Sequence, residues 1–185
     1  KNSPGHIALA RSLAKQENYY GLDLGSLEMI GLDIALALAK RKGSLALGLT
    51  EISDDIADAL GKHKGPLQLD GLVALAAGAA KSLARNRGSL SLSGLTNLED
   101  NVASELARHV GDKALDLRQV ATLSSSAAES LSYHSGGVHI PSLVGLPETP
   151  GHNAFAAKLA GQWGEFSLAL VEMSDPAAEF FADHK

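Results

Sequence analysis

The histidines are the residues of this chain whose type and spacing could most directly do chemistry. His63, His109, His134 and His184 each stand three residues after the last large apolar residue of a predicted helix, and Asn86 fills the same slot between the first two. Imidazole is the commonest metal ligand in proteins, so a ladder of histidines could hold an ion. Neighbouring helices lie about 8–10 Å apart, however, which is too far for two imidazoles to share one ion. We therefore predict that these side chains cap helix C-termini, with no metal site and no cofactor.

Other patterns that could support catalysis do not form a recognisable active site. Ser, His and Asp are all present, but their spacing follows an internal repeat and not a nucleophile elbow. Gly48, Gly71 and Gly94 recur without a dinucleotide-binding or phosphate-loop motif, so we expect them to serve turns. His6 and His152 each follow Pro-Gly and have no partner nearby in the sequence, which predicts a local hydrogen bond. We predict that the chain is not an enzyme.

The composition excludes several classes of function. The 185 residues include no cysteine, which removes disulfides, thiolate zinc sites and cysteine nucleophiles. The net charge is −5, and no basic stretch is interleaved with aromatic residues, so nothing favours a nucleic-acid partner. No apolar run reaches the roughly 18 residues that a membrane span needs. The compartment stays unknown, although the sequence favours a secreted or cell-surface location over the cytoplasm.

The apolar residues reveal the elements that must position these side chains. Gly43, Gly65, Gly88 and Gly111 recur every 22 to 23 residues. Between them one phrase returns, and its copy over residues 90–107 reads Leu-Ser-Leu-Ser-Gly-Leu-Thr-Asn-Leu and then Val-Ala-x-x-Leu-Ala. Seven strand-bearing copies begin near residues 22, 45, 67, 90, 115, 138 and 166. The chain is therefore predicted to be a single repeat domain over residues 1–185.

Each copy changes its period midway. The L-x-L part alternates, which indicates a strand with one buried side, and the later part spaces apolar residues as a short helix does. Ser53, Glu99-Asp100, Ser124 and Ser174 offer capping oxygens or first-turn acids where the helices begin. Lys, Arg or His and then Gly follow the helices, so we expect these cations to meet the helix dipole and the glycine to adopt a left-handed conformation that ends the helix.

The repeated phrase resembles the leucine-rich repeat family. The copy that begins at Leu90 is most similar to the cysteine-containing subclass, with Leu72, Leu95 or Val120 in the cysteine position, and we identify it as a compact bacterial variant. The resemblance implies an α/β fold, a right-handed leucine-rich-repeat solenoid with the parallel sheet on the concave face and the short helices on the convex face. It also implies protein binding as the usual role.

A second, longer period links the two ends of the chain. Residues 3–16 and 149–162 both follow the pattern of Ser or Thr, then Pro-Gly-His and a helix, at an offset of 146 residues. They belong to longer coils over 3–21 and 149–164, which carry an insertion that we expect to protrude. Either this helix entry simply recurs among duplicated units, or the chain is a segment of a longer array with a super-repeat.

The outward positions of the predicted strands form a face of small and polar side chains. A tight protein-binding face is usually built around Tyr, Trp or Arg anchors, and this one is not. It is either a solvated sheet face or a binding face for a flat or extended partner. On the second interpretation the candidate contacts are Gln68, Asp70, Ser91, Ser93, Asp116, Arg118 and His139.

Charges gather at the two ends of the predicted helices. Acids cluster where helices begin and bases where they end, which places them on opposite edges of a repeat stack. Compensation of helix dipoles accounts for this pattern, and so does edge-to-edge pairing between neighbouring molecules. We therefore keep two hypotheses for function: a non-enzymatic scaffold for protein–protein interaction, and a structural protein that self-assembles into filaments or a surface layer. The expected partner is another protein or other copies of the chain.

Overall fold

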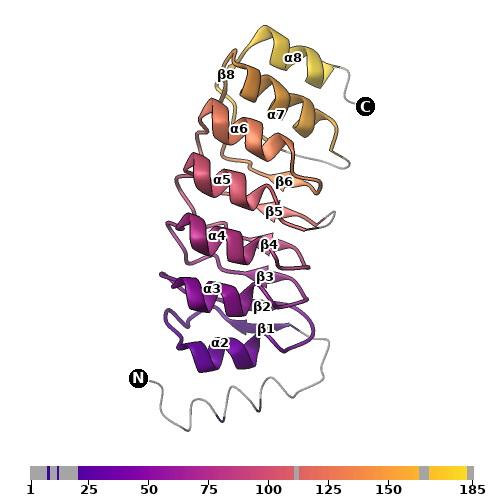
Figure 1. The fold of residues 1–185 in the computed structure, drawn as a ribbon. Coiled ribbons are helices and arrows are strands. Elements are labelled where there is room, and N and C mark those ends of the chain that lie inside the picture. The colour runs from indigo at the N-terminus through magenta and orange to yellow at the C-terminus, as the bar shows by residue number, and fades with distance from the viewer. Residues whose placement is uncertain (1–7, 9–11, 13–20, 111–112, 163–166, 183–185) are drawn as a thin grey trace.

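The fold is a ladder of parallel strands that alternate along the chain with short helices (Figure 1). This computed structural model describes residues 8, 12, 21–110, 113–162 and 167–182. Six strands form one sheet in sequence order: β1 (Leu22–Leu24), β2 (Leu45–Leu47), β3 (Leu67–Gln68), β4 (Leu90–Ser91), β5 (Leu115–Asp116) and β6 (Val138–His139). Each begins at the first apolar residue of a copy of the repeated phrase. The alternating L-x-L pattern therefore forms the strands of this sheet.

Neighbouring strands place equivalent residues of successive repeats side by side. Leu45 pairs with Leu67, Leu67 with Leu90, and Leu90 with Leu115 in a parallel register. One repeat of the chain separates the members of each pair, so every repeat adds one strand to the edge of the sheet. A residue at a given place in the phrase thus stands in a row that runs the length of the ladder.

The helices stack in a second column beside the strands. Their bounds are α2 (Leu32–Leu38), α3 (Asp54–Leu60), α4 (Ala77–Leu83), α5 (Asp100–Leu106), α6 (Ser125–Ser132), α7 (Pro150–Ala160) and α8 (Asp175–Ala182). Each contacts the next along the chain, and Figure 1 shows them piled from α2 to α8 with the six strands alongside. Of these helices, none is long and apolar enough to cross a lipid bilayer.

The core is a set of similar aliphatic layers, one per repeat. In the repeat of β2 and α3, Leu45, Leu47, Leu49, Ala57 and Leu60 are all buried. Burying one such leucine contributes about 1.5–3 kcal/mol, whereas an isolated seven-residue helix is unstable in water. The helices therefore depend on packing against neighbouring layers, as the repeat pattern predicts.

Polar side chains mark the helix starts as expected. The Ser53 hydroxyl accepts a hydrogen bond from the Ile56 amide at 3.4 Å, and Ser124 accepts one from Ala127 at 3.0 Å. Asp100 supplies an acid in the first turn of α5. Each such cap satisfies an amide that the helix itself leaves unpaired.

The glycines that mark the repeat have a different role from the one predicted. Of the described glycines, Gly43 alone has a positive φ, 86°, so the left-handed conformation expected at Gly65 and Gly88 is wrong. A Cβ atom at Gly65 would overlap the carbonyl of Gly43, and one at Gly88 would overlap the backbone of Gly65. These glycines allow successive turns to approach closely, and the helices end in right-handed caps without them.

The last coil departs from the regular ladder. Strands β7 (Gly145–Leu146) and β8 (Glu172–Met173) form a separate two-stranded parallel sheet. The strand predicted near residue 166 begins outside the described residues, and residues 167–170 are not in a strand. Their backbone still meets the preceding repeat, because the Ala169 amide donates to the Pro141 carbonyl at 2.9 Å.

Helix α7 of the second Pro-Gly-His coil packs against the preceding repeat, where the coil was expected to protrude. Gly151 and His152, at the start of α7, are both buried, and a Cβ at Gly151 would overlap the Ser125 carbonyl. The prediction of a protruding insertion is therefore wrong for this helix start, because the glycine lets it dock closely. Most of the matching coil at 3–21 lies outside the described residues.

Candidate interaction surface

The sheet register aligns outward side chains into one row, which we call the sheet-face row. Consecutive strand residues point to opposite faces, and the aliphatic residues on either side of each member belong to the core or pack against it. Strand neighbours in such a row are about 4.7–4.9 Å apart. The row consists of Asp23, Ala46, Gln68, Ser91, Asp116 and His139. The structure thus brings together four of the residues that the sequence analysis proposed as contacts.

The remaining three proposed contacts lie two residues further along their repeats. The Asp70 carboxylate accepts hydrogen bonds from the Ser91 hydroxyl at 2.5 Å and from the Ser93 amide at 3.1 Å. The Arg118 guanidinium forms an ion pair with Asp116, with 2.9 Å between Nη2 and Oδ2. The first set of bonds joins Asp70 to Ser91 of the sheet-face row and the second joins Arg118 to Asp116, so the second line lies beside the row on the same surface.

The ion pair at the centre of this surface is only partly enclosed. The Arg118 side chain is 60% exposed and the Asp116 side chain 21%. Asp116 Oδ1 is shielded from solvent and accepts no hydrogen bond from any described residue. A pair in this position contributes little to stability, about 0–1 kcal/mol. Its guanidinium remains accessible to an incoming carboxylate or carbonyl group.

Large apolar side chains are missing from the sheet-face row and lie elsewhere on the surface. The most exposed of them, Met29, Val73, Tyr133 and Val171, lie outside the six-stranded sheet. An aliphatic or aromatic anchor of the kind that dominates many protein interfaces is therefore absent from the row. Recognition on this face would depend on hydrogen bonds and on the fit of an extended surface.

The predicted histidine ladder forms a second row inside the molecule, which we call the interior polar row. His63, Asn86, His109 and His134 are 2% exposed or less. His63 approaches two carbonyls of the preceding repeat, with Nδ1 3.3 Å from Ala39 O and Nε2 3.0 Å from Gly43 O. Because these carbonyls belong to the end of the previous helix and its turn, His63 caps its neighbour and joins two repeats.

Asn86 fits its slot with a fuller set of hydrogen bonds. Its amide nitrogen donates to the carbonyls of His63 at 2.7 Å and Gly65 at 3.2 Å. Its amide oxygen accepts from the Gly88 amide at 2.9 Å. A neutral imidazole has a single N–H, so a histidine can donate to only one carbonyl at a time. The asparagine satisfies three buried backbone groups at once.

The interior polar row holds its histidines in the neutral form. Burial lowers the pKa of His63, His109 and His134 from the ordinary 6.5, although nearby backbone carbonyls partly oppose it. Positive charge adds to the effect, from Arg41 on His63 and from Lys158 on His134. These histidines therefore serve structure at neutral pH without bearing a charge.

The two last histidines of the row stack on each other. The ring centroids of His109 and His134 lie 5.7 Å apart with 25° between the ring planes. The lone pairs of an imidazole lie in the ring plane, so stacked rings do not direct them at one point. In the described part of the chain, no three His, Asp or Glu side chains are grouped so that they could hold a metal ion. His184 lies outside the described residues.

His152 makes the hydrogen bond that its position predicts, and a second one between repeats. Its Nδ1 lies 2.7 Å from the Thr149 hydroxyl, and its Nε2 lies 3.1 Å from the Leu123 carbonyl. The side chain thus fastens the start of α7 to the turn of the preceding repeat. His6 lies outside the described residues.

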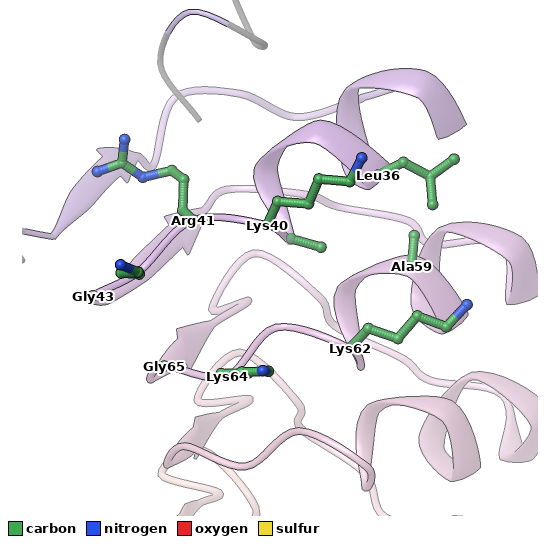
Figure 2. Close-up of a pocket in the computed structure, with 10 residues that line it drawn as sticks. Leu36, Lys40, Arg41, Gly43, Ala59, Lys62, Lys64 and Gly65 are labelled. Carbon is green, nitrogen blue, oxygen red and sulfur yellow. The ribbon is translucent and has the colours of Figure 1, made fainter. Parts of the chain in front are cut away.

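A basic cleft, which was not predicted, lies where the sequence indicated only that bases cluster beyond the helix ends. The turns after α2 and α3 enclose a cleft of about 580 Å³ (Figure 2). Its lining includes five cations and no acid: Lys40, Arg41, Lys42, Lys62 and Lys64. The signal was the run at 40–42 and its partial copy at 62–64, one repeat later. Periodicity placed these residues on one edge but could not show that two turns leave a hollow.

Comparison with known proteins leaves the chain without a relative from which a function could be taken. No family model matches it, and no curated protein or solved structure has significant similarity to it. The chain is therefore classified by its architecture, a repeat-like α/β arrangement of six parallel strands and alternating helices.

Proposed function

We propose that this chain is a leucine-rich-repeat solenoid that acts as a non-enzymatic scaffold for protein–protein interaction. The observation that carries the proposal is the in-register alignment of polar side chains along the four strands from β3 to β6. Such a surface offers hydrogen-bonding groups at regular intervals to an extended or flat partner. We propose no cofactor and no catalytic residue.

The shape that we propose follows from the spacing of the two columns. Parallel strands repeat about every 4.8 Å, whereas packed helices need about 8–10 Å. Joining the two columns in every repeat makes the stack curve, with the sheet on the concave face and the helices on the convex face. Connections between parallel neighbouring strands are nearly always right-handed, so we propose a right-handed solenoid. The sheet-face row would then line the inner curve.

Photo-crosslinking in the native cells tests this proposal. A photoreactive residue is placed at Gln68, in the sheet-face row, and at Lys81, which is exposed on α4. We expect a discrete protein adduct from position 68 that disappears when Arg118→Glu is added, and none from position 81. Equal adducts from both positions, or none from either, would overturn the scaffold proposal.

Self-assembly is the second function that an observation favours. Acids such as Asp54, Asp55 and Asp100 lie in the first turns of helices, and the bases lie beyond the opposite helix ends. Side-by-side molecules could pair an acidic edge with a basic one. Sedimentation of the purified chain tests this: assembly should weaken steeply with salt, because exposed charges are screened. A monomer at low salt and high concentration would rule it out.

A further inference from the structure

The basic cleft between α2 and α3 lies apart from the sheet-face row. Its lining residues come from α2, α3 and the turns that follow them, whereas the row is formed by the strands. Lys40, Lys42, Lys62 and Lys64 are all exposed, and Arg41 is buried. Figure 2 shows Lys40 and Lys62 running in the same direction on either side of Ala59, with the Arg41 guanidinium directed away from them.

The acid closest to these lysines does not neutralise the cleft. Asp58 pairs with Lys62 at 2.7 Å and at the same time with Arg85 at 3.0 Å. Two cations thus share one carboxylate, which itself does not line the cleft. The bond to Lys62 and these positive charges hold the pKa of Asp58 below its usual 3.8. In the described part of the chain, Lys40, Lys42 and Lys64 form no ion pair with an acid.

Compensation of helix dipoles does not fully account for these lysines. The last turns of α2 and α3 contain no basic residue, and the cations lie beyond the caps Ala39 and Gly61. The dipole effect is confined to the terminal turn and is worth about 0.3–1 kcal/mol for an exposed charge. Placing like charges of two repeats around one hollow adds repulsion, which an anionic ligand would relieve.

The walls of the cleft indicate the chemistry of that ligand. Leu36, Ala39 and Ala59 line it beside the lysines, so a ligand would meet apolar surface as well as positive charge. The lining contains no aromatic side chain on which a nucleic-acid base could stack. Its accessible cations are lysines, which act as compact point charges on flexible stems. Separate carboxylates interspersed with apolar side chains match this lining best.

We propose that the basic cleft binds an acidic peptide segment of a partner protein, with carboxylates on Lys40, Lys42 and Lys64 and an apolar side chain against Leu36. The inference rests on the proposed scaffold function only in taking the partner to be a protein. Direct titration with a peptide can succeed or fail whatever the result of crosslinking at the sheet-face row, so failures of the two proposals are distinguishable.

The test is fluorescence anisotropy of a labelled peptide of alternating Glu and Leu, titrated with the full chain. The cleft variant carries Lys40→Glu and Lys64→Glu, and the matched control carries Lys81→Glu and Arg108→Glu, which changes the net charge equally. We expect about tenfold weaker binding for the cleft variant, which corresponds to about 1.4 kcal/mol. The control should bind within about twofold of the parent, since exposed charges beyond roughly 10 Å are screened. Circular dichroism verifies that each variant folds.

Two further arms test the apolar contact and the class of ligand. Leu36→Asn should weaken the Glu/Leu peptide but leave a Glu/Ser peptide unchanged. A single-stranded oligonucleotide of equal charge should compete poorly. The proposal is overturned if the peptide does not bind, if the control loses as much affinity as the cleft variant, if Leu36→Asn has no effect on the Glu/Leu peptide, or if the oligonucleotide competes as well as the peptide.

Discussion

The interior polar row and the sheet-face row are built by the same repeat but meet opposite surroundings. Members of the interior row, three histidines and one asparagine, are buried, and the equivalent slot holds Arg41 after α2 and Gln162 after α7. Members of the sheet-face row are exposed or half-buried, and they include acidic, amide, hydroxyl, imidazole and methyl side chains. Each side chain of the interior row carries a planar nitrogen group that can donate a hydrogen bond to carbonyls of the preceding repeat. His63, Asn86 and His134 therefore join neighbouring repeats, and we propose that the second row is available for recognition.

Among the changes that test the difference between the two rows, Asn86→Leu should have the largest effect on stability. The change leaves the carbonyls of His63 and Gly65 and the amide of Gly88 without their partner in a buried site. One unsatisfied buried group costs about 1–3 kcal/mol, so we expect the free energy of unfolding to fall by about 3 kcal/mol. Urea unfolding followed by circular dichroism measures it. A loss under about 1 kcal/mol, the low end of that range, would show that the interior row does not hold the repeats.

The next effect tests the close approach of the turns on which the interior row depends. In Gly65→Ala the new Cβ overlaps the Gly43 carbonyl, so the two turns must move apart. Overpacking of this kind typically costs about 1–3 kcal/mol. The control is Gly25→Ala, where the glycine is exposed and a Cβ would approach only a side-chain oxygen of Asp23. If both variants unfolded at the same urea concentration, close packing of the turns would not be the reason for the glycine.

A third, smaller effect is a dependence of stability on pH. The folded pKa of His63 is lowered, so the unfolded chain takes up the proton first as the pH falls below 6.5. The free energy of unfolding is therefore undiminished above pH 6.5. Between pH 6.5 and the folded pKa it falls as the pH falls, by at most about 1.4 kcal/mol per pH unit for each such histidine. His63→Asn, which introduces the side chain found at Asn86 one repeat later, should keep the stability at neutral pH and make the decline shallower. An equal change in His139→Asn, on the sheet face, would contradict this assignment.

The smallest expected effect is on the stability of sheet-face variants. Gln68 is exposed, and its side chain lies on the outward face of β3, away from the leucine layers. Gln68→Ser should therefore change the free energy of unfolding by less than about 0.5 kcal/mol. Thermal unfolding measures it. A loss comparable with that of Asn86→Leu would break the distinction between the two rows.

The regular part of the fold could be predicted because one phrase repeats. Alternation of leucines marks the six strand starts, and a one-residue error in a strand would turn its leucines outward, so the positions are strongly determined. The separate β7–β8 sheet was not predicted, because Leu146 and Met173 occupy the last apolar slot of the phrase, which is not in a strand at Leu75, Leu98 or Leu123. The role of Gly65 could not be predicted from the sequence either, since its close approach to Gly43 depends on how two turns stack.

The candidate surfaces were predictable to different degrees. The sheet-face row follows directly from strand register, so the repeat alone is enough to group Gln68, Ser91, Asp116 and His139. The ion pair of Asp116 with Arg118 depends on side-chain conformations, which periodicity does not determine. The basic cleft depends on the space left between two turns, and no pattern of residue types encodes that volume.

One variant of the sheet-face row tests most directly whether the row serves recognition and not stability. Alanine replaces Ser91, Asp116 and His139 together, in a chain that carries the photoreactive residue at Gln68. We measure the yield of the protein adduct in native cells. Urea unfolding first verifies that the variant unfolds at the same urea concentration as the parent. The account predicts that the adduct is lost while the fold is kept. A full yield of adduct would contradict the assignment of the sheet-face row as the recognition surface.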